Sequence, residues 1–241
     1  MGLRLLVSVV DAGEAREAAA AGADIVDVKN PAEGSLGAPS PAVIADIRAA
    51  VPAALPVSAA IGDMPNLPGT AALAALGAAH SGAAFVKVGL WGASTQAEAV
   101  ALLRTVREAA REAVVVAGAY ADARRLEHAP LAPELLPRVA RAADVEVCLL
   151  DTAVKDGRGL LDWLAPDALT ALVDEAHELG LEMALAGALR AQDLPIVGAT
   201  GADIAGVRSA ACADGDRTGA LDPSRVRALR AACAAMPRAT R

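Results

Sequence analysis

The chain contains only three lysines, and each one lies at or just beyond the end of a short apolar segment. Lys29 closes the segment DIVDVK, Lys87 closes FVK, and Lys155 follows the run VCLLD by four residues. The remaining basic residues, 22 less these three, are all arginine. A guanidinium stays charged, whereas a lysine amine can lose its proton. The distribution therefore predicts amine chemistry at these three positions.

Two aspartates accompany the lysines. Asp27 stands two residues before Lys29, so the period of two in a strand places both side chains on one side, with the Asp one step deeper. Asp151 closes the run that precedes Lys155 in the same way. Crowding and burial lower amine pKa values, and the carboxylates oppose this effect. We expect a neutral Lys29 as an imine-forming nucleophile and Lys87 as a general base, against the alternative of surface lysines at strand ends.

The elements that must position these side chains form a regular alternation. Apolar runs of five or six residues are each followed by an Ala-rich amphipathic stretch that often ends in Gly. The eight expected strands are 5–10, 24–29, 56–61, 85–90, 114–119, 147–151, 182–186 and 203–208. Near-continuous apolar strands indicate a parallel sheet covered on both faces by helices.

Eight such units predict one (β/α)8 TIM barrel over residues 1–241, since this fold needs about 250 residues. The alternative is a doubly wound open sheet, but the sequence after the first expected strand, DAGEAR, lacks a GxGxxG turn. In a barrel the site lies at the C-terminal ends of the strands. The lysines belong to the second, fourth and sixth runs. Alternate strands of a barrel contribute side chains to the same interior layer, so we expect the lysines to converge at the mouth.

Phosphate groups are commonly held in such barrels by the loops after the seventh and eighth strands. The corresponding residues here are Gly187, Ala188, Gly206, Arg208 and Ser209. Glycine lets the backbone approach an anion and Arg208 would add a charge-assisted contact. The alternative is that these glycines only make tight turns. The segment 30–37 is expected either to cover the substrate or to serve as an ordinary connection.

Composition excludes several classes of function. A net charge of −7 and a pI near 5.0 argue against binding to nucleic acid. The N-terminal apolar run is too short for a membrane span and is followed by acidic residues, so neither membrane insertion nor export is expected. Cys148, Cys212 and Cys233 lack the spacing of a disulfide framework or a zinc site, which favours a reduced, cytoplasmic protein. No metal or organic cofactor is predicted.

Five segments carry a resemblance to a known family: ADIVDVKNPAEGSLGA, PVSAAIGD, FVKVGLWG, LLDTAVKDGRGL and AGVRSAAC. Together they make the chain closely similar to the (5-formylfuran-3-yl)methyl phosphate synthases, also called 4-(hydroxymethyl)-2-furancarboxaldehyde phosphate synthases. The resemblance covers nearly the whole chain, and the segment DVKNP-x-EGSLGA is its most specific part.

The resemblance implies a TIM-barrel lyase that joins two molecules of glyceraldehyde 3-phosphate, with loss of phosphate and water, for a methanofuran-type cofactor. The family's Schiff-base lysine falls on Lys29 and its proton-accepting lysine on Lys87, while further site residues fall on Asp27, Asp151 and Lys155. Two alternatives stay open: a Schiff-base aldolase acting on a sugar phosphate, and a non-catalytic barrel that binds a phosphorylated metabolite. A homo-oligomer is expected from the Ala-rich helix exteriors.

Overall fold

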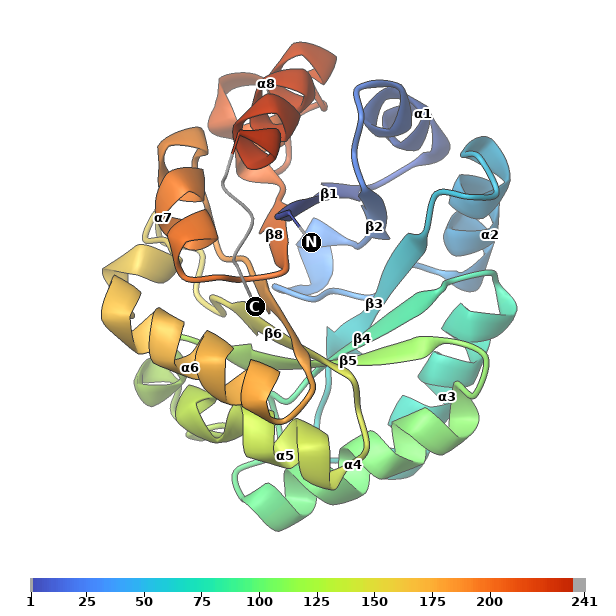
Figure 1. Ribbon diagram of the computed structural model, residues 1–241. Coiled ribbons are helices and arrows are strands. Elements are labelled where there is room, and N and C mark those ends of the chain that lie inside the picture. Colours follow the sequence, from blue (N-terminus) through green and yellow to red (C-terminus); the bar gives the residue numbers. More distant parts are fainter. Residues whose placement is uncertain (1, 236–241) are drawn as a thin grey trace.

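The computed structural model describes residues 2–235, which form a closed barrel of eight parallel strands in the order β1 to β8 (Figure 1). The strands are β1 (Arg4–Val9), β2 (Ile25–Val28), β3 (Val57–Asp63), β4 (Phe85–Gly89), β5 (Val114–Tyr120), β6 (Val147–Asp151), β7 (Glu182–Leu185) and β8 (Ile204–Val207). The predicted TIM barrel is confirmed. Each expected strand overlaps an observed one, and β3 runs two residues further than expected, to Asp63.

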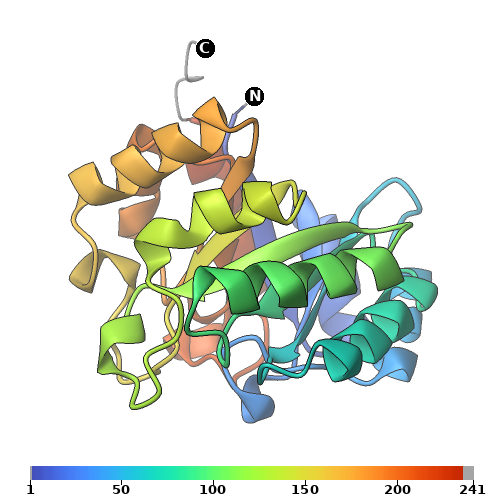
Figure 2. The ribbon, with the colours of Figure 1, turned by 90° about the horizontal axis from the view of Figure 1, so that it is seen from below.

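Within residues 2–235, eight α-helices surround the strands, as Figure 1 shows, and Figure 2 gives the side view. They are α1 (Ala12–Ala20), α2 (Pro41–Ala50), α3 (Pro68–His80), α4 (Gln96–Ala109), α5 (Leu136–Ala142), α6 (Pro166–Glu178), α7 (Leu194–Ala199) and α8 (Pro223–Ala234). Short 3₁₀ turns are η1 (Pro31–Glu33), η2 (Ala123–Arg125), η3 (Pro133–Leu135), η4 (Leu160–Asp162), η5 (Ala191–Asp193), η6 (Ser209–Ala211) and η7 (Ala213–Gly215). The expected single domain over 1–241 includes residues 1 and 236–241, which lie outside the described residues.

Local signals set where the helices begin. The Asp11 carboxylate accepts the backbone N–H of Glu14 at the start of α1, and Thr95 and Glu98 form a reciprocal capping box at the start of α4. Proline occupies the first turn of most of the other helices, where its missing N–H costs nothing. Each of these signals sets the residue at which a helix begins, and therefore where the preceding loop ends.

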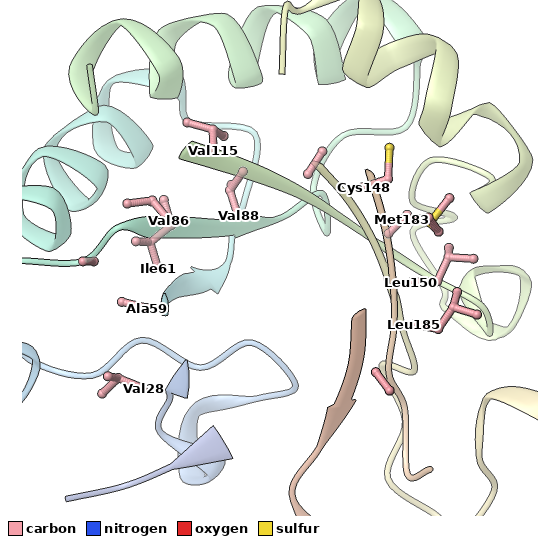
Figure 3. Packing of buried hydrophobic residues seen from close by; sticks show 14 of the residues in the cluster. Val28, Ala59, Ile61, Val86, Val88, Val115, Cys148, Leu150, Met183 and Leu185 are labelled. Carbon is pink, nitrogen blue, oxygen red and sulfur yellow. The ribbon is translucent and has the colours of Figure 1, made fainter. Parts of the chain in front are cut away.

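Apolar side chains pack on both faces of the barrel wall. Between the strands and the helices lies a large cluster that includes Val28, Val86, Leu150 and Leu185 (Figure 3). The inward faces supply a smaller cluster, composed of Leu6, Ile25, Leu36, Ala60, Val116, Val147, Leu149, Ala184, Ala186 and Ile204. Because both faces are buried, the strands read as continuous apolar runs in the sequence.

Polar side chains replace the apolar ones on the inward faces near the C-terminal strand ends. The strand register places Asp27 of β2 beside Ser8 of β1 and Ser58 of β3, and all three are at most 2% exposed. Leu36, from the loop after β2, packs into the inner apolar cluster. Below this polar level the inward-facing residues are apolar, among them Leu6, Ile25 and Ile204.

Three further observations concern membranes, metals and thiols. Among residues 2–235 no helix is both long enough and apolar enough to cross a bilayer. Within the same residues, no group of three or more His, Cys, Asp or Glu side chains is arranged to hold a metal ion. Cys148, Cys212 and Cys233 are buried free thiols.

Candidate active site

A pocket opens at the C-terminal end of the barrel and reaches into its interior, with Leu6 and Ile25 in its lining. Its lining contains all ten residues that the sequence analysis selected, namely Asp27, Lys29, Lys87, Asp151, Lys155, Gly187, Ala188, Gly206, Arg208 and Ser209. They come from β2, β4, β6, β8 and the loops that follow β2, β6, β7 and β8, with Gly206 inside β8 itself and not in the loop after it. The expected convergence of the three lysines at one rim is therefore observed in the structure.

Lys87 is paired with Asp27 across the interior of the barrel. Its Nζ lies 2.6 Å from Asp27 Oδ2, and the two side chains are 5% and 0% exposed. The Ser8 hydroxyl donates to the same carboxylate oxygen at 2.9 Å. The other oxygen, Oδ1, and the nearby Ser58 hydroxyl have no hydrogen-bond partner among the described residues. Lys87, Asp27 and Ser8 thus form a short polar chain in the pocket floor.

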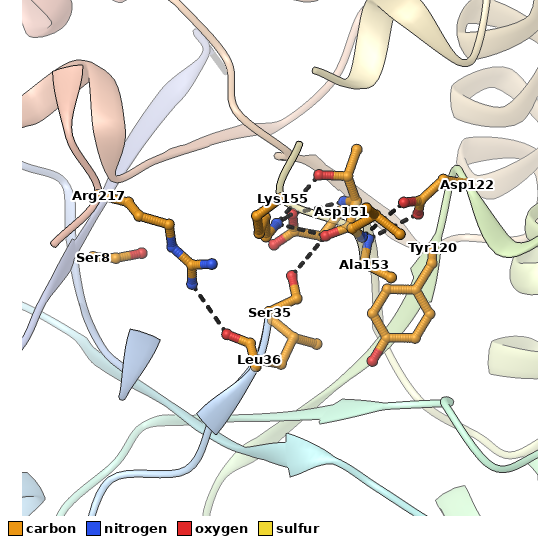
Figure 4. A network of polar contacts seen from close by, with 12 residues as sticks. Ser8, Ser35, Leu36, Tyr120, Asp122, Asp151, Ala153, Lys155 and Arg217 are labelled. Carbon is orange, nitrogen blue, oxygen red and sulfur yellow. Dashed lines mark hydrogen bonds and ion pairs between the residues drawn. The ribbon is translucent and has the colours of Figure 1, made fainter. Parts of the chain in front are cut away.

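Lys155 is paired with Asp151 at the opposite side of the site (Figure 4). Its Nζ lies 3.1 Å from Asp151 Oδ1 and also contacts the backbone oxygen and hydroxyl of Thr152. Burial alone would raise the pKa of Asp151, but Lys155, Lys29 and the Thr152 N–H outweigh it and lower that pKa to about 2. Asp151 is therefore a carboxylate at any working pH.

Lys29 makes neither a hydrogen bond nor an ion pair through its amine to any described residue, and it is only 9% exposed. Burial lowers its pKa from 10.5 to about 8, with Asp151 and Asp27 opposing the shift and Lys87 and Lys155 adding to it. This competition between crowded amines and carboxylates agrees with the expectation from the sequence. The arrangement supplies an amine that is partly neutral near neutral pH, which is what attack on a carbonyl requires.

Comparison of the sequence with known proteins identifies the family of this chain. A model of the 4-HFC-P synthase family matches residues 5–230. The chain is 48% identical over 234 residues to the (5-formylfuran-3-yl)methyl phosphate synthase of Methanocaldococcus jannaschii, covering 95% of this chain and 99% of that one. It is 51% identical over 236 residues to the enzyme of that name from Methanopyrus kandleri, covering 96% and 99%. The chain belongs to the 4-HFC-P synthase family. The resemblance inferred from the sequence motifs is confirmed.

Solved structures resemble this 4-HFC-P synthase family member in fold alone. A 3-hexulose-6-phosphate synthase aligns with a TM-score of 0.62 at 20% identity, covering 96% of this chain and 99% of the other. KGPDC from Streptococcus mutans aligns with a TM-score of 0.63 at 12% identity, covering 98% and 99%. Both comparisons support the barrel architecture.

Sequence reasoning missed the residues that hold the loops of this family member in place. Asp63, at the end of β3, accepts the backbone N–H groups of Ser35 and Leu36 at 2.7 and 3.2 Å and the hydroxyl of buried Tyr120 at 2.5 Å. The Ser35 hydroxyl donates to Thr152 O at 2.8 Å, which ties the loop after β2 to the loop after β6. A carboxylate that closes an apolar strand, as Asp63 closes PVSAAIGD, was the available signal.

Asp122 plays the same part for the loop that carries Lys155. It is 1% exposed and accepts the backbone N–H groups of Ala153 and Val154, each at 2.8 Å (Figure 4). Two buried carboxylates, Asp63 and Asp122, therefore fix two loops of the mouth. Neither of them lines the pocket, so both position other residues.

Arg208 lines the pocket, but its guanidinium is fully engaged within the protein. Its Nη1 and Nη2 donate to Glu14 at 2.5 and 3.1 Å, and further N–H groups donate to the backbone oxygens of Ser8, Arg217 and Gly219 at 3.1, 2.9 and 2.9 Å. A guanidinium has five N–H donors, so none remains for the phosphate contact that the sequence analysis expected of Arg208.

The loop after β7 contains two residues of positive φ in the pocket wall. They are Gly187 and Ala188, at 102° and 48°. A Cβ on Gly187 would lie 2.9 Å from Thr152, so only glycine fits there. The non-glycine Ala188 held at positive φ in a pocket wall is the kind of strain found at functional sites.

Proposed function

We propose that this chain is a (5-formylfuran-3-yl)methyl phosphate synthase that condenses two molecules of glyceraldehyde 3-phosphate through an imine on Lys29. The supporting observation is Lys29 itself, a buried amine of lowered pKa in one pocket with two lysine–aspartate pairs. The family membership supports the same reaction. By atom balance, two triose phosphates give the furan aldehyde phosphate, one orthophosphate and two water molecules.

The first steps use Lys29 and Lys87. The neutral amine of Lys29 attacks the aldehyde carbon of one glyceraldehyde 3-phosphate, and a water molecule leaves as the imine forms. The Lys87 ammonium, held by Asp27, donates a proton to that water, and the resulting amine then removes the acidic C–H proton beside the imine to give an enamine. The second triose phosphate isomerises to the ketone form, whose carbonyl carbon accepts the new C–C bond.

The later steps eliminate phosphate and water and close the ring. The C–O bond to one phosphate breaks as electrons flow from the Lys29 nitrogen, and Lys155 lies at the same rim to balance the departing negative charge. Asp151 keeps Lys155 oriented. The terminal carbon that lost phosphate is now an enol carbon and attacks the ketone carbon of the second triose. The primary hydroxyl of that triose closes the ring on the carbon beside the imine, and loss of two water molecules gives the aromatic furan. One water then hydrolyses the imine, which releases the aldehyde and the Lys29 amine.

The test is incubation with glyceraldehyde 3-phosphate while free phosphate and ultraviolet absorbance are followed, with borohydride quenching and peptide mass analysis. We expect phosphate release, a new conjugated chromophore and an adduct on Lys29, all absent from Lys29→Ala. An adduct without phosphate release would instead identify a Schiff-base aldolase, and ligand binding without an adduct would identify a binding barrel. Normal turnover by Lys29→Ala would contradict the mechanism.

We also propose that the enzyme works in the cytoplasm as a homo-oligomer without a bound cofactor. Support for assembly comes from α3 and the residue before it, where Leu67, Leu73 and Leu76 are 54%, 73% and 53% exposed. Exposed leucines gathered on one helix are more typical of a contact surface than of a solvated one. Light scattering coupled to size exclusion measures the mass, and a monomer would exclude this part of the proposal.

A further inference from the structure

Five basic side chains line the pocket, and three of them are already neutralised by a carboxylate. The five are Lys29, Lys87, Lys155, Arg208 and Arg217. The three ion pairs are those of Lys87 with Asp27, Lys155 with Asp151, and Arg208 with Glu14, at 2.6, 3.1 and 2.5 Å. Lys29, whose pKa is lowered to about 8, is the amine assigned to imine formation. The fifth basic side chain is Arg217.

Arg217 has no carboxylate partner at ion-pair distance within residues 2–235. Its guanidinium makes one hydrogen bond there, from Nη2 to the backbone oxygen of Gly34 at 3.0 Å. Four of its five N–H groups are thus unused by those residues. Figure 4 shows the side chain extending toward the segment that carries Ser35 and Leu36. Arg217 therefore spans from the loop after β8 to the loop after β2, at the edge of the pocket.

The backbone around Arg217 is held in place from below by Arg208. The Arg208 guanidinium donates to the backbone oxygens of Arg217 and of Gly219 at 2.9 Å each, while Glu14 fixes its other edge. The Asp216 carboxylate also accepts the N–H and hydroxyl of Thr218 at 2.9 and 2.8 Å. These contacts place Arg217 over the pocket with little freedom of its main chain.

We propose that Arg217 binds one of the two substrate phosphate groups, as a phosphate subsite separate from the loop of Gly187 and Ala188 in the same pocket. This inference rests on the proposed function, because that reaction brings two triose phosphates into one pocket. A guanidinium can keep one N–H on Gly34 and present two others to phosphate oxygens as a planar fork. Arg208 then acts as a positioning residue for Arg217.

Charge supports the assignment. The chain is acidic overall, with a net charge of −7, so a phosphate dianion is attracted only by local positive charge. Arg217 is the pocket arginine whose full positive charge has no attached carboxylate among the described residues. We place the other phosphate at the loop of Gly187 and Ala188. The two subsites lie on different loops, as two separate substrate molecules require.

The experiment compares the parent chain with Arg217→Gln, whose amide can still donate to Gly34 but carries no charge. Titration calorimetry with inorganic phosphate should show a weaker or missing phosphate site. The KM for glyceraldehyde 3-phosphate should rise by roughly tenfold to a hundredfold, the size expected for one charge-assisted contact. Borohydride trapping of unphosphorylated glyceraldehyde should be unchanged, because that aldehyde presents no phosphate.

Two further variants complete the test. Arg217→Lys keeps the charge without the fork and should recover part of the phosphate affinity. Arg190→Gln removes an exposed arginine from the loop after β7, outside the pocket lining, and should behave as the parent. A phosphate isotherm for Arg217→Gln identical to that of the parent overturns the inference, even if furan is still formed. Weakened phosphate binding in a chain that forms no furan leaves the inference standing and rejects the proposed function.

Discussion

The Nζ of Lys87 lies 2.6 Å from the Oδ2 of Asp27, and the same oxygen accepts the hydroxyl of Ser8. Both members of this ion pair are almost completely buried. An ion pair in such surroundings depends on each partner, since either charge alone would be left in a medium that solvates it poorly. The pair therefore couples the stability of the barrel to the chemistry of its mouth.

Replacing Lys87 by methionine should destabilise the protein by about 3–5 kcal/mol, because Asp27 is left as an uncompensated buried charge. The double variant Lys87→Met with Asp27→Asn removes both charges and should recover most of that loss. Urea unfolding followed by circular dichroism measures both values. If the single variant unfolded at the parent's urea concentration, the buried pair would be irrelevant to stability.

The rate of imine formation should rise with pH through about 8, where Lys29 loses its proton. The Asp151 charge raises the pKa of Lys29, so Asp151→Asn should move the midpoint of trapping below 8. Asp156→Asn serves as the control, since this exposed carboxylate lies in the same loop and pairs with Arg158. Trapped adduct on Lys29, measured by peptide mass over pH 6–10, reports the midpoint. Equal midpoints in both variants would contradict the assigned role of Asp151.

Replacing Lys29 by methionine should abolish activity and yet stabilise the fold at pH 7, by about 1–3 kcal/mol. The amine titrates at 10.5 when unfolded and at about 8 when folded, so burial of its charged form opposes folding. That penalty is complete below pH 8, declines as pH rises from 8 to 10.5, and vanishes above. Denaturant unfolding at pH 7 and pH 10.5 measures the difference. A Lys29→Met chain less stable than the parent at pH 7 would contradict this.

Tyr120→Phe should loosen the loop after β2, because Asp63 would lose the hydroxyl that orients its carboxylate toward Ser35 and Leu36. Burial raises the pKa of Tyr120 well above 10, and the negative charge of Asp63 adds to this shift. The phenol therefore stays a donor at all working pH values. The loss of a hydrogen bond to a charged group costs about 1.5–3 kcal/mol. Hydrogen exchange should be faster at residues 35 and 36; unchanged protection would refute the link.

Gly37→Ala should disrupt the same loop, since a Cβ there would lie 2.1 Å from the backbone oxygen of Asn30. Backbone cannot move aside as a flexible side chain can, so we expect a loss of activity along with a lowered melting temperature. Gly69→Ala is the matched control, because nothing lies within 4 Å of its Cβ position. Equal melting temperatures and equal activities in the two variants would contradict this prediction.

Much of the fold followed from local pattern. The alternation of apolar runs and Ala-rich stretches predicted the eight strands, and the absence of a GxGxxG turn favoured closure over an open sheet. The period of two in a strand placed Asp27 and Lys29 on one side of β2, and both line the pocket. These predictions depend on neighbours along the chain, so the sequence was sufficient for them.

The sequence by itself determined the barrel and the end of it at which the lysines and aspartates gather. Only the tertiary structure decided which charges pair: Asp27 with Lys87, 60 residues away, and Arg208 with Glu14, 194 residues away. It also placed Arg217 on the pocket and Asp63 beneath the loop after β2. The physical reason is that ion pairing and donor saturation depend on distances of a few ångströms across the ring of strands, which the order of residues along the chain does not specify.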